Sequence, residues 1–470
     1  MFTYRKLFCY FGIAVIVLLH SRSSQAEMMA LLDDGPTSLQ ARLSLIDAAE
    51  SEIMLAYWGI DSSEAPRQII SQLCQRARSG VTVRILADGF GTRFAEDLAA
   101  QMATAGVQVR IYHPLLSGRP EWLNCRLHSK LMVVDRKAMV IGSRNLGDDY
   151  LRQTDPSFVD CDALVLGPIC DQAAEYIERL WISSDVVALD QCHPIAMNGP
   201  NTYSRWTLAL LSTPVEAVKW LTGTTETDST SVYPNAPAIE PTEYRTVSFQ
   251  TALGLSGELE WQQRLTHLNV TWHATSSNQI TLLYDQPPVK ASTAMAQRLI
   301  QMIDCATQSV VIESPYPAFS DAFSAALQRA AARGVAVHLV TNSLASTNHP
   351  VVYAAYQNQK NVLLNSGVKI YEFIGTQHLH AKNLVIDQRI AMLGSYNFNQ
   401  RSEMSDLEFC IVTEDPGAAA ALLQSIAKRG ASTQSVTATF IAAPLNSGTL
   451  LRRVTTRAAQ IVAPLIRPLL

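Results

Sequence analysis

The chain carries one pattern of residues twice, and this repeat constrains its fold more than any other feature does. In each copy a histidine is followed two residues later by a lysine, seven residues later by an aspartate, and then by Gly-Ser-x-Asn. The first copy spans 128–145 and the second spans 380–397, so the shared positions are all displaced by 252 residues. Weaker matches upstream keep the same order in both copies. The chain is therefore predicted to contain two homologous domains.

Local patterns predict the fold class. Apolar residues recur at helical spacing over 38–51 and 64–79, and the second helix is expected to end before Gly80, a residue that commonly caps helices. An apolar strand follows over 81–87. Repeated helix and apolar strand indicate an α/β fold in which helices cover both faces of a sheet. The aspartate of each pattern lies between two short apolar runs, which predicts a β-hairpin.

The shared residues point to chemistry on a phosphate group. Residues two apart on an extended strand point to the same side, so each histidine and its lysine face one spot. If the two copies meet across a pseudo-twofold interface, their imidazoles, ammonium groups and amides surround a single phosphate. One imidazole can attack phosphorus to give a phosphohistidine while the other protonates the leaving alkoxide, and the lysines and asparagines stabilise the developing charge. The candidate catalytic residues are His128, Lys130, His380 and Lys382, and the candidate phosphate-binding residues are Ser143, Asn145, Ser395 and Asn397.

Four acids complete the candidate site. Asp135 lies seven residues after His128, about 23 Å along an extended strand at ~3.3 Å per residue. It is therefore expected to close its hairpin turn, as is Asp387 in the second copy. Glu408 and Asp162 lie in apolar runs after the pattern, and we expect them to contact the catalytic imidazoles, the alternative being solvated carboxylates on an edge strand. No clear metal-ligand spacing is present, so neither a metal nor a cofactor is expected.

The two ends of the chain have distinct compositions. Residues 1–26 combine a basic start, a 13-residue apolar run and small residues at the end, which is typical of a signal peptide, the alternative being an N-terminal anchor. The apolar run is shorter than the ~20 residues that span a bilayer as a helix, which favours cleavage after Ala26. Residues 436–470 combine apolar residues at helical spacing with four arginines and no acid, which predicts an amphipathic segment that contacts a membrane.

The rest of the chain divides into three parts. The two copies occupy 27–197 and 293–435, and 198–292 is predicted to be a linker or accessory region with structure of its own near 206–220 and 278–284. The chain has 37 basic and 41 acidic residues, and loss of the three basic residues in 1–26 leaves 34 against 41, a net charge of -7. This balance argues against a protein that coats nucleic acid, because such binding depends on lysine and arginine.

The duplicated His-x-Lys-x4-Asp pattern, with Gly-Ser-x-Asn after each copy, resembles the phospholipase D superfamily. The segments 145–168 and 341–345, together with 397–402, are similar to the bacterial cardiolipin synthase C type. The resemblance implies two phospholipase D-like α/β/α sandwich domains with pseudo-twofold symmetry and one shared active site. It also implies transfer of a phosphatidyl group, with phosphatidylethanolamine as the donor, to phosphatidylglycerol to form cardiolipin. The resemblance further implies that His128 is the nucleophile and that His380 is the general acid and base.

Two other reactions stay open for the same site. One is that of an exported phospholipase D, in which water is the acceptor and phosphatidic acid the product, and the less favoured one is that of a phosphodiesterase or nuclease. The expected partners are phospholipids and a membrane surface, and no nucleic acid is expected. The signal-like N-terminus predicts a location on the periplasmic face of a bacterial inner membrane, or export.

Overall fold

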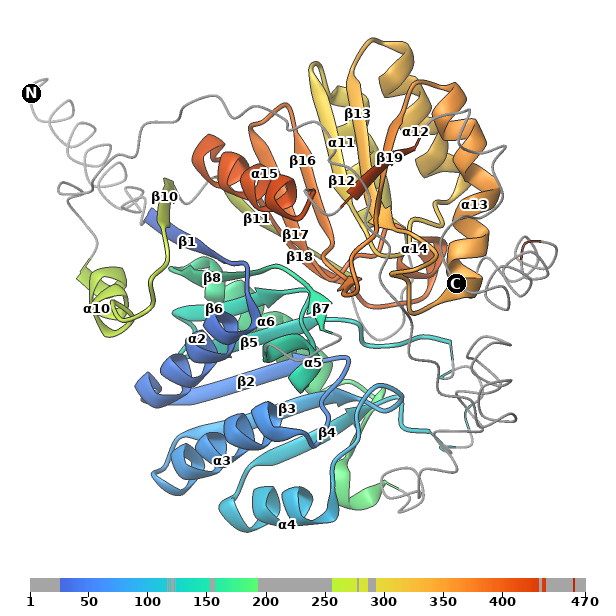
Figure 1. Ribbon diagram of the computed structural model, residues 1–470. Helices are drawn as coiled ribbons and strands as arrows, with labels where there is room; N and C mark the ends of the chain where they lie inside the picture. Colours follow the sequence, from blue (N-terminus) through green and yellow to red (C-terminus); the bar gives the residue numbers. More distant parts are fainter. Residues whose placement is uncertain are drawn as a thin grey trace, which may run out of the picture.

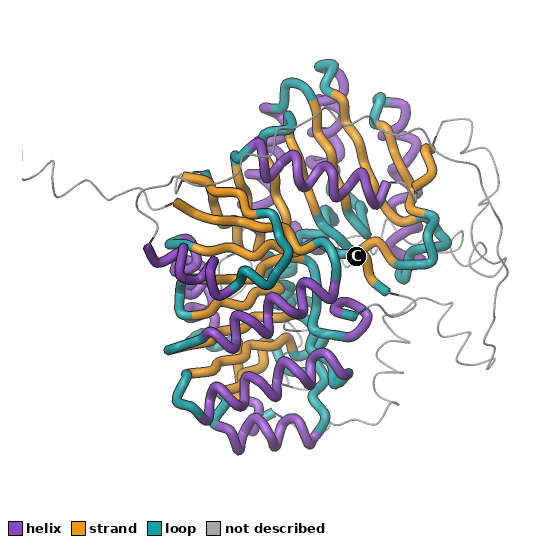
Figure 2. Tube along the Cα trace, turned by 60° about the vertical axis from the view of Figure 1, so that its left-hand side comes forward, coloured by secondary structure: helices purple, strands orange, loops and turns teal. Residues whose placement is uncertain are grey.

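The two copies of the repeat fold into two halves, each built on its own sheet (Figure 1). The computed structural model describes residues 26–192, 256–276, 279–285, 293–430 and 433–436, except Leu116, Gly118, Pro120, Glu121, Leu123 and 153–156, and it also describes Gln460. Each sheet has helices on both faces, which confirms the predicted pair of homologous α/β halves (Figure 2).

Within the described residues, the first half forms a nine-stranded sheet in the order β10-β1-β8-β6-β5-β2-β3-β4-β9. Its strands are β1 (Ala26–Leu32), β2 (Glu52–Tyr57), β3 (Thr82–Asp88), β4 (Gln108–Tyr112), β5 (Lys130–Val134), β6 (Ala138–Gly142), β8 (Asp162–Leu166), β9 (Val186–Ala188) and β10 (Trp272–Ser276). Strands β2, β3 and β4 are parallel, whereas β5 and β6 form the predicted antiparallel hairpin. One face packs on α2 (Gly35–Ala48), α3 (Glu64–Arg78) and α4 (Glu96–Ala105), and the other on α6 (Ile169–Trp181).

The second half repeats this arrangement with an eight-stranded sheet in the order β11-β18-β17-β16-β12-β13-β14-β19 among the described residues. Its strands are β11 (Ile280–Tyr284), β12 (Ser309–Glu313), β13 (Ala336–Asn342), β14 (Lys369–Phe373), β16 (Asn383–Ile386), β17 (Ile390–Gly394), β18 (Phe409–Thr413) and β19 (Thr433–Val436). Helices α11 (Ala294–Cys305), α12 (Asp321–Ala332) and α13 (Pro350–Asn365) cover one face, and α15 (Pro416–Gly430) covers the other. The short elements are α5 (Asp148–Leu151), β7 (Phe158–Val159), η2 (Leu189–Gln191), α10 (Ser256–Arg264), β15 (His378–Leu379) and α14 (Gln400–Met404).

A shared apolar core joins the halves. It contains residues of α6 and α15 together with the facing sides of both sheets. Helix α6 packs against β11 of the second sheet, and α15 packs against β1 of the first. Because this buried surface is continuous, burial of apolar side chains fixes how the two halves face each other.

The region predicted to be a linker supplies an edge strand to each sheet. Strand β10 pairs with β1 in the first sheet, and β11 pairs with β18 in the second. The region near 278–284, where structure of either kind was expected, contains strand β11, while the structure expected near 206–220 lies outside the described residues, as do 1–25 and nearly all of 437–470. Among the helices that the structure describes, none is long and apolar enough to cross a membrane.

Candidate functional site

The segments that carry the two histidines dock on each other's half of the chain. The backbone N–H of His380 donates to the Val159 carbonyl oxygen (2.8 Å), next to the parallel pairing of β15 with β7. The backbone N–H of His128 donates to the Leu407 carbonyl oxygen (2.9 Å), next to a parallel bridge between Leu127 and Leu407. The pseudo-twofold interface therefore brings each histidine next to the segment of the other half that carries Asp160 or Glu408.

This exchange gives each imidazole a carboxylate. His128 Nδ1 lies 3.1 and 3.0 Å from the two carboxylate oxygens of Glu408, and His380 Nδ1 lies 2.8 Å from Asp160 Oδ1. Burial opposes ionisation of Asp160, but the neighbouring His380 and Lys382 outweigh it and lower the pKa of this carboxyl. A carboxylate at Nδ1 orients the ring and leaves Nε2 as the reacting nitrogen. Burial lowers the pKa of His380 to about 3 and that of His128 well below its usual range, so the free imidazoles are neutral.

The expectation that Asp162 contacts an imidazole was wrong. Its carboxylate Oδ2 accepts from Ser38 Oγ (2.6 Å) and lies 3.1 Å from Arg42 in a fully buried ion pair. Strand pairing explains the difference: Asp162 lies opposite Gly142 inside its own sheet, and Cys410 lies opposite Gly394 in the second. Two residues before Asp162 and Cys410, just ahead of β8 and β18, Asp160 and Glu408 occupy equivalent positions, which are the ones that reach the other half.

Each of the two lysines contacts the backbone of the histidine of its own pattern. Lys130 Nζ donates to the His128 carbonyl oxygen (2.6 Å), and Lys382 Nζ donates to that of His380. Burial lowers the pKa of Lys130 to about 8 and that of Lys382 to about 7, although neighbouring carboxylates oppose the shift. Near neutral pH the site therefore holds ammonium groups that lose their protons easily and that a bound anion would keep charged.

These pKa values predict a pH dependence of anion binding. Tungstate, a phosphate-like dianion, is expected to bind more weakly as the pH rises from 7 to 9, because both lysines lose protons over this range. Binding favours the charged lysines, so it should take up about one proton per site at pH 8. Calorimetry in buffers of different ionisation enthalpy measures this uptake. An affinity that is constant from pH 7 to 9, with no proton uptake, would contradict the prediction.

The asparagines and serines of the two patterns have different tasks. Asn145 and Asn397 are each 7% exposed, and their Oδ1 atoms have no hydrogen-bond partner within the described part of the chain. Ser395 Oγ instead donates to Glu408, and Ser143 Oγ to the Cys161 carbonyl oxygen (3.1 Å). The two serines thus hold the segments that carry the acids, in contrast to their expected role as phosphate ligands. An amide oxygen is an acceptor, so the asparagines can bind a phosphate oxygen only through their N–H groups.

Asp135 and Asp387 lie at the hairpin turns. Asp135 has a φ of 50°, and its carboxylate accepts from the backbone N–H groups of residues 50–52. Asp387 has a φ of 52° and accepts from those of residues 307–309. Each aspartate therefore ties its turn to the start of the neighbouring strand, β2 or β12, and contacts backbone in place of an imidazole.

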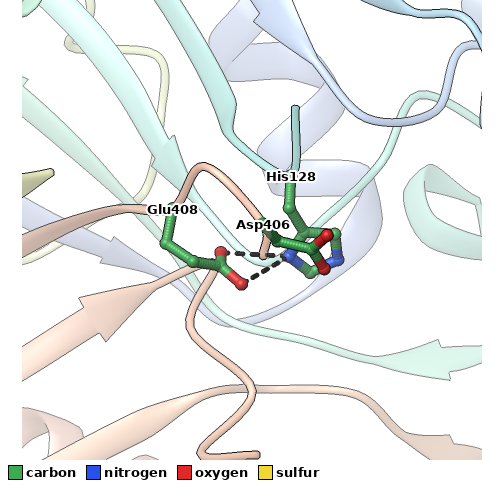
Figure 3. A group of neighbouring side chains, drawn as sticks. All are labelled: His128, Asp406 and Glu408. Atoms are coloured by element: carbon green, nitrogen blue, oxygen red, sulfur yellow. Dashed lines mark hydrogen bonds and ion pairs between the residues drawn. The ribbon is translucent and has the colours of Figure 1, made fainter. Parts of the chain in front are cut away.

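A third acid lies beside His128 (Figure 3). One donor atom each of His128, Asp406 and Glu408 lies within 4.8 Å of the others, a spacing that could hold a metal ion. Arg401 Nε, however, lies 3.0 Å from Asp406 Oδ2, and the charge of Lys130 disfavours protonation of His128. Glu408 also accepts hydrogen bonds from Ser395 Oγ and Ser402 Oγ. Because both carboxylates already have partners from the protein, we interpret the group as a hydrogen-bond and ion-pair network that positions His128.

Sequence reasoning missed several residues of the site. Five of them contact an imidazole, and these are Trp58, Tyr150, Phe158, Asp160 and Tyr316. Ser402 donates to Glu408, and Arg401 forms an ion pair with Asp406 beside His128. One signal was present for Asp160, since it directly follows an apolar residue and precedes an apolar run, as Glu408 does. The aromatic residues had no signal, because they lie far from the repeat in sequence or in loops that differ between the copies.

Comparisons with known proteins agree with this geometry. The family described as "Cardiolipin synthase, PLD-like domain" matches residues 43–181 and 299–429, one stretch in each half. The chain is 26% identical over 434 residues to cardiolipin synthase C of Escherichia coli (strain K12), which covers 85% of this chain and 84% of that protein. It is 24% identical over 393 residues to cardiolipin synthase A of Pseudomonas fluorescens (strain SBW25), covering 82% and 64%.

A solved structure supports the fold. The chain is similar to the crystal structure of phosphatidylserine synthase of Haemophilus influenzae Rd KW20, with a TM-score of 0.64 over 94% of this chain and 95% of that one. The two sequences are 15% identical, so the likeness concerns the arrangement of the two halves. That arrangement is the one that brings two imidazoles, two lysines and two amides together.

Proposed function

Because this chain belongs to the family of cardiolipin synthase PLD-like domains, we propose that it forms cardiolipin from phosphatidylglycerol and a second phospholipid, phosphatidylethanolamine. It is an enzyme of the phospholipase D type, a phosphatidyltransferase. The observation that supports the finer proposal is the pair of buried imidazoles, each held at Nδ1 by a carboxylate of the other half.

In the first step, His128 Nε2 attacks the phosphorus of the donor. A phosphorus–nitrogen bond forms, the phosphorus–oxygen bond to the head group breaks, and the leaving oxygen takes a proton from His380. The negative phosphate raises the proton affinity of His380 in the complex, which offsets the effect of burial. Lys130, Lys382 and the two amides stabilise the charge on the phosphoryl oxygens.

In the second step, the hydroxyl group of phosphatidylglycerol gives its proton to His380 Nε2. The oxygen bonds to phosphorus, and the phosphorus–nitrogen bond breaks with its electron pair returning to His128. Atoms and charge balance over the two steps, and the imidazoles regain their starting states. Water in place of the alcohol would give phosphatidic acid by the same route.

The test uses vesicles of phosphatidylethanolamine and phosphatidylglycerol, with products identified by mass. Cardiolipin and free ethanolamine in equal amounts are the expected result. Phosphatidic acid as the main product would make the enzyme a hydrolase, and release of nucleotides from DNA without lipid turnover would favour the nuclease.

We also propose that residues 436–470 bring the enzyme to an anionic membrane surface, on the periplasmic face of the inner membrane or after export. This segment lies almost entirely outside the described residues, and the proposal rests on its apolar spacing and four arginines. Deletion of 449–470 is expected to lower co-sedimentation with phosphatidylglycerol vesicles while a soluble substrate is still turned over. Unchanged co-sedimentation would contradict the proposal.

A further inference from the structure

The two imidazoles differ in the aromatic rings beside them. The Trp58 ring centroid lies 5.7 Å from that of His128. Beside His380, the ring centroids of Tyr150 and Tyr316 lie at 5.5 and 6.4 Å. The Phe158 ring lies at 5.2 Å from His380 and has no hydroxyl group. All four rings meet their imidazole edge-on, and of these the two tyrosines beside His380 carry hydroxyl groups. The pseudo-twofold symmetry of the fold therefore does not extend to the chemistry at its two ends.

The two halves contribute one phenol each. Tyr150 belongs to α5 of the first half, and Tyr316 follows β12 in the second. Both residues are half-buried, whereas His380 is 6% exposed. Burial raises the pKa of both phenols, so both stay neutral near neutral pH and keep their hydroxyl hydrogens.

The hydrogen bonds of the two hydroxyl groups are complementary. The Tyr316 hydroxyl donates to Asn348 Oδ1, so its oxygen retains lone pairs that can accept. The Asn145 amide partly offsets the effect of burial on the pKa of Tyr150, as a donor near the phenol oxygen does. A neutral phenol has one hydrogen, which the Tyr150 hydroxyl can donate to a ligand. One phenol can thus accept from a ligand hydroxyl and the other can donate to it.

We propose that Tyr150 and Tyr316 form the acceptor subsite and select an alcohol with a second, neighbouring hydroxyl, such as the glycerol head group. This inference rests on the proposed phosphatidyl transfer and on the role of His380 as the base. The attacking hydroxyl gives its proton to His380 Nε2, forms the oxygen–phosphorus bond and displaces His128. The neighbouring hydroxyl donates to the Tyr316 oxygen and accepts from Tyr150, contacts that a simple alcohol or water cannot make while attacking.

The experiment compares two soluble acceptors. Vesicles of phosphatidylethanolamine are incubated with glycerol and 1-propanol together, and phosphatidylglycerol and phosphatidylpropanol are quantified by mass. The wild-type enzyme is expected to favour glycerol. Tyr316→Phe and Tyr150→Phe, which remove one oxygen atom each, should each lower the ratio of the glycerol product to the propanol product about tenfold, because a polar site discriminates strongly for a hydroxyl.

Tyr356→Phe is the matched control, since the Tyr356 hydroxyl bonds to Glu372 in the second half and faces neither imidazole. The control should keep the wild-type ratio. If the wild-type enzyme transfers phosphatidyl groups but both site variants keep its ratio, the acceptor subsite is wrong and the proposed function stands. If the wild-type enzyme yields no product from the lipid at all, the proposed function fails and this inference fails with it.

Discussion

His128→Ala should lower phosphatidyl transfer by on the order of 10⁴-fold or more, because the variant lacks the atom that bonds to phosphorus. His380→Ala should lose transfer to a similar extent but keep the nucleophile. With phosphatidyl-p-nitrophenol as donor, whose leaving group needs no acid, His380→Ala is therefore expected to release a burst of one p-nitrophenol per enzyme and then stop. Intact-protein mass spectrometry should find the phosphatidyl adduct on His128.

His267→Ala is the control for this pair, because His267 contacts Ser44 outside the site. It should retain wild-type turnover. A burst from His128→Ala, or an adduct on His380, would reverse the assigned roles of the two imidazoles while leaving the covalent mechanism in place. A linear release from both histidine variants without any adduct would rule out the phosphohistidine.

Asp160→Asn should mainly lower turnover and Asp162→Asn should mainly lower stability, although only one residue separates the two positions. Asp160 holds His380 Nδ1 at 2.8 Å, so the amide should disturb the tautomer and lower the turnover of the folded protein by about 10³-fold. Asp162 forms a buried ion pair with Arg42, and loss of its charge should lower the free energy of unfolding by about 3 kcal/mol. Turnover of the folded Asp162→Asn protein should stay near that of the wild type.

Denaturant unfolding and turnover, measured on the same preparations, separate the two cases. If Asp162→Asn loses more turnover than Asp160→Asn at equal folded fraction, the contact of Asp160 with His380 is not the one that supports catalysis. Glu408→Gln extends the comparison to His128, and it is expected to behave like Asp160→Asn.

The sequence predicted the duplicated halves, and the fold has them. It also pointed to the histidines, lysines and asparagines that the structure gathers, since each is fixed by its spacing within one strand or hairpin. The place of Asp135 in its turn was predicted in the same way, but its contacts with residues 50–52 join positions 83 to 85 apart and were not. The choice between Asp160 and Asp162 was not available from the sequence. Residues two apart on a strand share a face, so alternation cannot distinguish them.

The sequence by itself predicted that the two copies share one site. The histidine, lysine and asparagine of one copy can bind an anion, whereas both copies together supply the nucleophile and the acid that transfer of a phosphatidyl group needs. Only the tertiary structure decided which carboxylate serves which imidazole, since both pairs join residues more than 200 positions apart, across an interface formed by the shared core of α6 and α15. It also decided that the two ends of the site differ. Identical motifs specify identical side chains, whereas their neighbours depend on loops and on packing that each half acquired separately.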